Sequence, residues 1–193
     1  KRDKEIRQGN YLNKFEQKMK TPKTTVLCLY NNMFTRDLKT ILSFEILKQI
    51  MDIVYVETVR EKEGGTYGVS VGLAIERIPS GLTKFMINYD TDPEKVERIN
   101  PIIEQELKQI AASGPKEADF RKVIEFMNKD FNERIKTNPY WSNIILNNAF
   151  YGEDYYSTYS STLNSLTLND IKDIAAKLLA PGNKTEIIMN PAK

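Results

Sequence analysis

The sequence predicts an α+β domain in which an antiparallel or mixed sheet carries several helices on one face. Residues 24–30 are β-branched or apolar on both faces of the predicted strand, which is typical of a buried strand. Residues 67–75 alternate large apolar with small side chains, and residues 85–89 alternate again after a Pro-Ser-Gly turn, which predicts an antiparallel hairpin. Apolar residues at helical spacing occupy most of the remaining chain.

Two long helices flank this hairpin in the sequence. Helical periodicity begins at Asp37 and continues towards Glu61, where Gly64-Gly65 is expected to stop it. Asp92-Pro93 provides an N-cap and a first helical residue for the second helix, and Gly114-Pro115 ends it. The order strand, helix, hairpin and helix is therefore expected from residue 24 to residue 113.

The remaining third of the chain is predicted to be mainly helical. One helix starts near Lys116, another is capped by Asn138-Pro139, and two shorter pieces are expected at 155–163 and 168–179. Pro181-Gly182 is expected to end the last helix, and a terminal strand is predicted at 185–189.

The domain is expected to span residues 24–193. Residues 1–23 are mostly polar and charged, and they are predicted to form a lead-in arm or linker. The chain begins without Met inside a polar segment, so it reads as one domain of a longer, multi-domain protein.

Charge and composition exclude several classes of function. The 28 Lys and Arg residues nearly balance the 26 Asp and Glu residues, so no strong positive field favours nucleic acid as a partner. There is no His, which removes His-based zinc sites and imidazole general bases, and the single Cys28 cannot form an intramolecular disulfide. No apolar run approaches the ~20 residues needed to span a bilayer, so membrane insertion is not expected.

The segment from Arg60 to Val69, REKEGGTYGV, is the best candidate for a functional site. Its two glycines allow a sharp reversal from helix to strand, which brings Arg60 close to Tyr67. A guanidinium and a phenol offer donors to a carbonyl or an oxyanion. The alternative is structural. The helix dipole favours a positive charge such as Arg60 at a helix C-terminus, Tyr67 is a strand residue, and the glycines form an ordinary cap.

The sequence resembles the second-half domains of the pitrilysin/insulinase family of zinc peptidases, the inverzincins. These domains carry a segment like R-E-x-x-G-G-x-Y-G-V, and the large bacterial members also carry segments like K-T-N-x-Y-W and Y-G-E-D. The corresponding segments here are REKEGGTYGV at 60–69, KTNPYW at 136–141 and YGED at 151–154. The resemblance covers residues 24–190.

The resemblance implies a zinc endopeptidase that degrades peptides or unfolded polypeptides in a closed chamber between two halves. The zinc motif, HxxEH, belongs to the N-terminal half of such enzymes, so the expected partner is an HxxEH-bearing half on the same chain or on a separate subunit. Zinc is expected in that half and no cofactor in this chain, which is expected to be inactive alone. By position, the family gives Tyr67 the role of donor to the scissile carbonyl and Arg60 the role of holding the substrate backbone. The resemblance to large bacterial members favours the periplasm over the cytoplasm.

Two other readings stay open. The same fold serves as a non-catalytic peptide-binding or assembly subunit when the zinc motif elsewhere has degenerated, and a free-standing peptide-binding module is a weaker possibility. Retention of both Arg60 and Tyr67 favours the enzyme.

The other conspicuous side chains have structural interpretations. Cys28 is expected to be inert core and Trp141 a packing anchor. The carboxylates Glu61, Glu63, Glu153 and Asp154 are expected to be solvated charges and not metal ligands. Four tyrosines either line a peptide-binding wall or, as the favoured interpretation, pack helices at the domain interface: Tyr151, Tyr155, Tyr156 and Tyr159.

Overall fold

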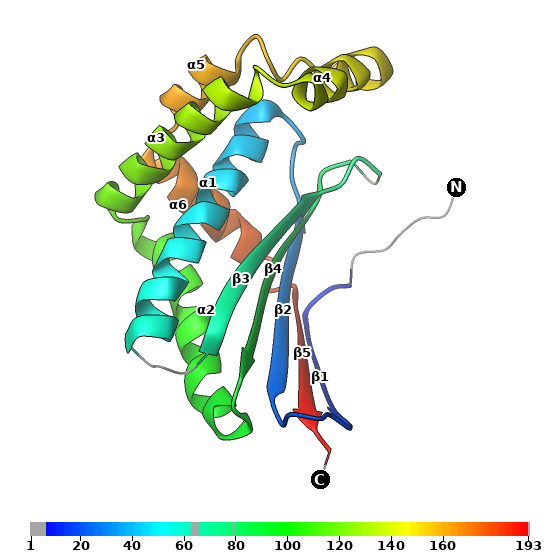
Figure 1. Ribbon diagram of the computed structural model, residues 1–193, viewed down its shortest axis with the longest axis vertical. Coiled ribbons are helices and arrows are strands. Elements are labelled where there is room, and N and C mark those ends of the chain that lie inside the picture. Colours follow the sequence, from blue (N-terminus) through cyan, green and yellow to red (C-terminus); the bar gives the residue numbers. More distant parts are fainter. Residues whose placement is uncertain (1–6, 63–65, 79, 193) are drawn as a thin grey trace.

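A computed structural model of the chain describes residues 7–62, 66–78 and 80–192. These residues build one five-stranded sheet with the strand order β1-β5-β2-β4-β3 (Figure 1). The strands are β1 (Asn10–Gln17), β2 (Thr24–Met33), β3 (Thr66–Ile75), β4 (Leu82–Thr91) and β5 (Lys184–Pro191). The pair β1 and β5 is parallel and all other neighbours are antiparallel, so the sheet is mixed, as the sequence predicts.

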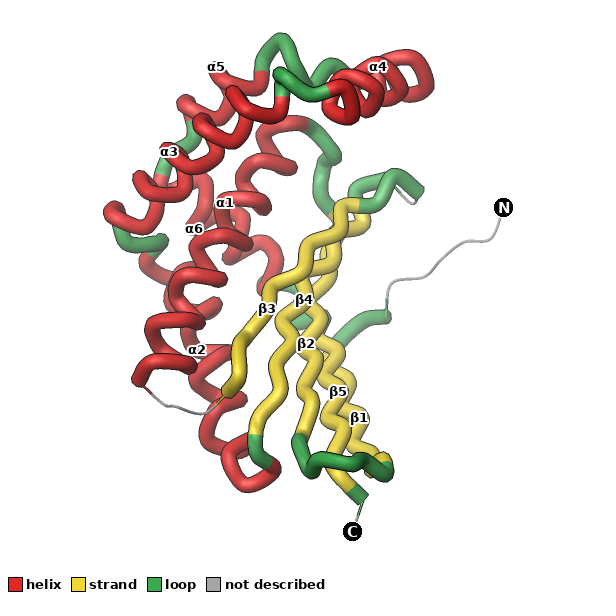
Figure 2. The backbone as a smooth tube through the Cα atoms, in the orientation of Figure 1, coloured by secondary structure: helices red, strands yellow, loops and turns green. Residues whose placement is uncertain are grey.

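The helices cover one face of this sheet and leave the other face open (Figure 2). They are α1 (Leu38–Tyr55), α2 (Val96–Ser113), α3 (Glu117–Arg134), α4 (Asn138–Tyr151), α5 (Tyr159–Ser165) and α6 (Leu168–Leu179). Two short helical segments, η1 (Val56–Lys62) and η2 (Pro93–Lys95), extend α1 and precede α2. The predicted α+β class with helices on one face is therefore confirmed.

The first long helix begins where the sequence predicts but changes form before it ends. The Asp37 carboxylate caps α1 by accepting the Thr40 N–H at 2.7 Å. The α-helix ends at Tyr55 and continues as the π-helix η1, whose wider turn the apolar spacing does not reveal. Gly64 and Gly65, the expected stop, lie outside the described residues.

The second long helix differs from the prediction at its start. Pro93 opens a 3₁₀ turn, and the Asp92 side chain makes no capping hydrogen bond. Asp92 instead forms an ion pair with Lys95 at 2.6 Å. The helix still ends at Gly114, as predicted.

The core lies between the sheet and α1, α2 and α6. The largest fully buried side chains come from α1 and from the facing side of β4, and α2 adds a stripe that includes Ile99, Ile103 and Leu107. On β4, Phe85, Ile87 and Tyr89 point into this core, which confirms the predicted alternation. The fold is therefore held chiefly by apolar burial on one face of the sheet.

The segment predicted to be a lead-in arm contains a strand. Residues 10–17 form β1, which pairs in parallel with β5 at the edge of the sheet. Every β1 residue except the half-buried Tyr11 is exposed, because no helix covers this edge. A strand exposed on both faces lacks apolar alternation, and its partner lies about 170 residues away, so local pattern does not predict it.

Glu153 is not the solvated charge that the sequence predicts. It forms ion pairs with Arg36, which precedes α1, and with Arg77 of the β3–β4 turn at 2.7 Å. The Tyr155 hydroxyl hydrogen-bonds to the same group of side chains. We call these four residues the Glu153 clamp; it ties the loop after α4 to the end of the sheet. Asp154 is also engaged, since it accepts the backbone N–H groups at 156 and 157.

Burial predicts that the same Leu→Ala substitution has very different effects on stability at two positions. Leu107→Ala is expected to lower the free energy of unfolding by about 2–5 kcal/mol, because Leu107 is fully buried between α2 and its neighbours. Leu146→Ala on the exposed surface of α4 is expected to stay within about 0.5 kcal/mol of wild type. Urea unfolding of both variants of this chain measures the difference, and equal losses would contradict the described packing.

The Glu153 clamp predicts a pH-dependent contribution to stability. Burial alone would raise the pKa of Glu153, but hydrogen bonds from Tyr155 and Arg77 and the charge of Arg36 outweigh it and hold the pKa below its ordinary value of 4.5. The ionised carboxylate therefore stabilises the fold above the ordinary pKa, and this stabilisation disappears as the pH falls through the lowered, folded-state pKa.

Glu153→Gln tests this prediction. At pH 7 the variant is expected to be less stable than wild type by about 1–2 kcal/mol, discounted for partial exposure. The gap is expected to narrow as the pH is lowered below 4.5. Glu125→Gln, on the exposed side of α3, is the control and should show no gap at either pH. A Glu153→Gln gap that does not change with pH would rule out the ionic clamp.

Candidate functional site

Arg60 and Tyr67 lie on two elements that meet at one end of the molecule. Arg60 belongs to η1 and Tyr67 is the second residue of β3, and these two elements contact each other. Figure 1 shows this end as the place where α1 passes into β3, opposite the end that carries α4. The side chains of Arg60 and Tyr67 are outside the described part of the structure. Their meeting at one point therefore stays a prediction, while the juxtaposition of their elements is a finding.

A β-bulge lies at Tyr67. Thr66 pairs with Thr91 and Val69 pairs with Tyr89, so Tyr67 and Gly68 together stand opposite the single residue Asp90. The regular pairing of this strand with β4 therefore runs only from Val69 to Ile75. Bulges of this kind redirect a side chain and increase strand twist, and they are frequent next to active sites. Nothing in the period-two pattern reveals the extra residue.

Buried contacts fix the helix end that carries Arg60. Val59 is fully buried within η1. The buried Tyr55 hydroxyl donates to the Ile103 carbonyl of α2 at 3.0 Å, and Glu57 pairs with Lys116 at 3.4 Å. Together these contacts hold the last turns of the helix to α2 and to the start of α3.

Asp52 links this helix to the strand that carries Tyr67. Its Oδ1 accepts the Val71 N–H at 3.2 Å, and its Oδ2 pairs with Lys48 at 2.9 Å. Helix and strand are therefore joined four residues beyond Tyr67. Sequence reasoning missed Asp52 because its partner is a backbone amide 19 positions away.

The strand beside this end has an open edge. β3 is the last strand in the sheet order and pairs only with β4 among the described residues. An unpaired strand edge presents backbone N–H and C=O groups that an extended peptide can pair with. The chemistry available here is thus donation and acceptance of hydrogen bonds towards a polypeptide backbone.

The described residues do not form a metal site. No group of three or more His, Cys, Asp or Glu side chains among them is placed to hold a metal ion. Guanidinium and phenol groups are donors and not the ligands that zinc prefers. The residues at this end therefore do not fit zinc binding within this chain.

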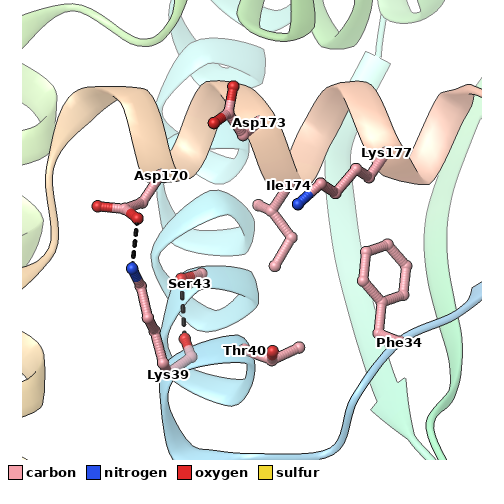
Figure 3. A pocket seen from close by; sticks show the side chains of 8 residues that line it. All are labelled: Phe34, Lys39, Thr40, Ser43, Asp170, Asp173, Ile174 and Lys177. Carbon is pink, nitrogen blue, oxygen red and sulfur yellow. Dashed lines mark hydrogen bonds and ion pairs between the residues drawn. The ribbon is translucent and has the colours of Figure 1, made fainter.

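Two cavities lie elsewhere. The first, of about 240 Å³, lies between the start of α1 and α6 (Figure 3). Two lysines and two aspartates balance each other around it, and Lys39 pairs with Asp170 at 2.7 Å. The second, of about 310 Å³, lies among α1, α3 and α4. Since Lys39 lies at the opposite end of the helix from Arg60, the first cavity is separate from the candidate site.

Cys28 and Trp141 have the structural roles that the sequence predicts. Cys28 is 2% exposed, and burial raises the pKa of its thiol to about 12, so it is not a nucleophile. Trp141 donates from Nε1 to the Ile135 carbonyl at 2.7 Å, and its ring packs against Tyr156 with centroids 4.8 Å apart.

The tyrosine cluster divides. Tyr159 is buried and stacks on Phe131 of α3 with centroids 4.1 Å apart, which agrees with helix packing. Tyr155 belongs to the Glu153 clamp, whereas Tyr151 is largely exposed and lies under the Arg77 guanidinium. Tyr159 thus packs helices together within this domain, whereas Tyr151 does not take part in such packing.

None of the helices in the described ranges is both long and apolar enough to traverse a lipid bilayer.

Several solved structures share this fold. The periplasmic protease PqqL from Escherichia coli is 15% identical and superimposes with a TM-score of 0.80 over 94% of this chain and 21% of its own. A protease from Helicobacter pylori is 10% identical, with a TM-score of 0.83 over 97% of this chain and 46% of its own. A peptidase M16 inactive domain from Pseudomonas fluorescens is 18% identical, with a TM-score of 0.73 over 96% of this chain and 44% of its own. This chain thus spans between about a fifth and a half of each.

The sequence itself identifies the family. No curated protein matches it. The family model described as the peptidase M16 inactive domain matches residues 5–127, which is more than half of the chain and includes the segment from Arg60 to Val69. The chain therefore belongs to the peptidase M16 inactive-domain family, that is, to the insulinase-like peptidases.

Proposed function

We propose that this chain is the substrate-binding and transition-state-supporting domain of a zinc-dependent endopeptidase that degrades peptides or unfolded polypeptides in a closed chamber. The observation that carries the proposal is the family match across REKEGGTYGV, a segment whose Arg and Tyr lie on two elements joined at one end of the sheet. The protein is one domain, spanning residues 24–193 with the β1 segment before it, of a longer chain or complex. The HxxEH-bearing half is its partner.

The names of the structural neighbours support this assignment. The proteins from Escherichia coli and Helicobacter pylori are named as proteases, and each contains more chain than the part matched here. A chain with no His needs a partner that supplies the zinc ligands. Zinc held by that partner would supply a Lewis acid and an activated water.

Tyr67 is assigned to the oxyanion. Its phenol O–H donates a hydrogen bond to the scissile carbonyl oxygen. This hydrogen bond becomes stronger as negative charge develops on that oxygen. The bulge at Tyr67 and Gly68 interrupts the regular register of β3 at this residue, and the Asp52 bond to Val71 fixes the strand to α1. Donors in such positions act when closure of the two halves brings them to the substrate.

Arg60 is assigned to the substrate backbone. Its guanidinium, on a helix end held by Tyr55 and Val59, donates to peptide carbonyls beside the scissile bond. The open edge of β3 offers further hydrogen bonds to an extended chain. Because these contacts exist before and during the reaction, they contribute to substrate binding more than to turnover.

A second function is supported by the family description. The matched family is described as an inactive domain, so the same fold also suits a non-catalytic peptide-binding or assembly subunit. The two functions differ in one observable, which is peptide hydrolysis by the full-length protein with zinc. Hydrolysis that a chelator abolishes supports the enzyme, and its absence from a folded, zinc-supplied protein supports the subunit.

Tyr67→Phe in the full-length protein is expected to lower kcat about 10²- to 10³-fold while KM changes little, because only the transition state loses a donor. A quenched fluorescent peptide provides the assay. Tyr151→Phe, at the opposite end of the domain, is the matched control and should retain wild-type turnover. An unchanged kcat for Tyr67→Phe would remove the oxyanion role.

Arg60→Ala is expected to raise KM about 10- to 100-fold with a smaller change in kcat, because it removes charge-assisted hydrogen bonds to the bound backbone. Arg98→Ala, on α2, serves as the control for loss of a surface arginine. If Arg60→Ala lowers kcat at constant KM, the residue acts on the transition state instead of on binding.

A further inference from the structure

The cavity of about 310 Å³ among α1, α3 and α4, which we call the α1–α4 cavity, has a largely apolar lining. Five aliphatic or thioether side chains line it: Leu38, Ile41, Leu42, Met127 and Ile144. Three phenol rings line it as well: Tyr140, Tyr155 and Tyr159. Small-molecule sites in proteins combine apolar and aromatic walls of this kind with a few polar groups that orient the ligand.

Glu45 of α1 brings a carboxylate to the α1–α4 cavity. The residue is half-buried, and its side chain forms no hydrogen bond or ion pair with any other residue that the structure describes. Burial raises the pKa of Glu45 above its ordinary value of 4.5, and the charges of Lys48 and Arg134 only partly offset this effect. The ionised carboxylate therefore lacks a compensating partner within the described part of the chain.

The two cations near Glu45 are already held by other carboxylates. Arg134 pairs through Nε with Asp130 at 2.7 Å, and Lys48 pairs with Asp52 at 2.9 Å. The charged groups that line the cavity are Glu45, Asp130 and Arg134. Two carboxylates against one guanidinium leave the lining with a net charge of −1 when Glu45 is ionised.

Two neutral polar side chains add hydrogen-bond acceptors to this lining. Gln49 follows Glu45 by one helical turn and faces the same side of α1, and Tyr140 approaches from α4. Within the described residues, neither the Gln49 amide nor the Tyr140 hydroxyl has a hydrogen-bond partner. The cavity thus offers a carboxylate, an amide oxygen and a phenol oxygen, and an ammonium group carries three N–H donors.

The volume of the cavity limits the size of the molecule that it can hold. An apolar cavity of roughly 150 Å³ holds benzene, so the α1–α4 cavity has room for a ring with a short chain. Phenol rings also attract cations through their faces, which suits an amine better than an anion.

We propose that the α1–α4 cavity binds a small organic cation, an amine with an apolar or aromatic body, and that Glu45 holds its ammonium head. The ammonium supplies the opposite charge that Glu45 lacks, and the body of the amine covers the apolar walls. An anion would meet a lining of net negative charge, and a neutral aromatic molecule would leave Glu45 buried without a partner.

This site is separate from the one proposed for peptide cleavage. Most of the α1 residues that line the cavity belong to the first half of that helix, whereas Arg60 follows its last residue. The proposal therefore does not depend on the catalytic roles of Arg60 and Tyr67, and it applies equally to a non-catalytic protein.

Calorimetric titration of the full-length protein with phenethylamine tests the proposal. This amine joins a phenyl ring to a protonated ammonium at pH 7, and phenethyl alcohol is the neutral probe of the same shape. Glu45→Gln removes the carboxylate charge at nearly constant shape. Glu125→Gln, on the exposed side of α3 and outside the cavity lining, is the matched control. Ile144→Trp fills part of the cavity from α4, and circular dichroism checks that each variant is folded.

Phenethylamine is expected to bind at least about tenfold more tightly than phenethyl alcohol, because only the amine forms a charge-assisted hydrogen bond with Glu45. Glu45→Gln is expected to weaken phenethylamine binding about tenfold or more and to leave the affinity for phenethyl alcohol unchanged. Glu125→Gln should bind both probes like wild type, and Ile144→Trp should weaken the binding of both.

Three results would overturn the proposal. The first is that phenethylamine does not bind to the folded full-length protein. The second is that wild type and Glu45→Gln bind it equally. The third is that Ile144→Trp leaves its affinity unchanged, because the amine would then occupy another place. Since the readout is a binding constant and not hydrolysis, failure of the proposed peptidase function would not affect the result.

Discussion

Burial of α1 on almost all of its sides is the constraint on which the rest of the structure depends. Its inner side packs on the sheet and its outer side contacts α3, α5 and α6, so the helix lies between two layers. The residues from Ile46 to Met51 include four fully buried apolar side chains, which fix both the rotation of the helix and its height along the sheet. The position of η1, and with it the position of Arg60, follows from this packing.

The two ends of α1 hold different parts of the structure in place. At one end, the π-helix η1, the bulge in β3 and the Asp52 bond to Val71 bring the backbone of the family segment together. At the other end, Arg36 immediately before α1 joins Glu153 and Arg77 and thereby holds α4. The end that carries Arg60 and the end that holds α4 are therefore separated by the length of one 18-residue helix, about 25–30 Å.

Local patterns predicted most of this fold. The alternation at Phe85, Ile87 and Tyr89 and the helical stripe of Ile99, Ile103 and Leu107 each identify the face that the structure buries. The patterns failed where the determining partner is distant in sequence. β1 is polar because it is an uncovered edge strand, and Glu153 looked like a surface charge because Arg36 lies 117 positions before it. The bulge at Tyr67 and the π-helix each add a residue to a regular element, and regular periodicity does not detect such an addition.

The candidate site was predicted in a different way. The spacing of Arg60 and Tyr67 alone favours a helix cap and a strand residue over a functional site, and only the resemblance to a family favours the functional interpretation. The family match and the shared fold support that resemblance, and the contact between η1 and β3 supports its geometric premise. The proposed function also requires a zinc-bearing half, which the donors of this domain would face.

The central claim is that Tyr67 reaches the scissile bond of a bound peptide. The most direct test replaces it with a photoreactive side chain, as Tyr67→benzoylphenylalanine, in the full-length protein after zinc has been removed with a chelator. Irradiation in the presence of a substrate peptide, followed by mass spectrometry, locates the crosslink. The account predicts a crosslink within one or two residues of the cleaved bond. Efficient peptide binding without any crosslink from position 67, or crosslinks scattered along the peptide, would contradict it.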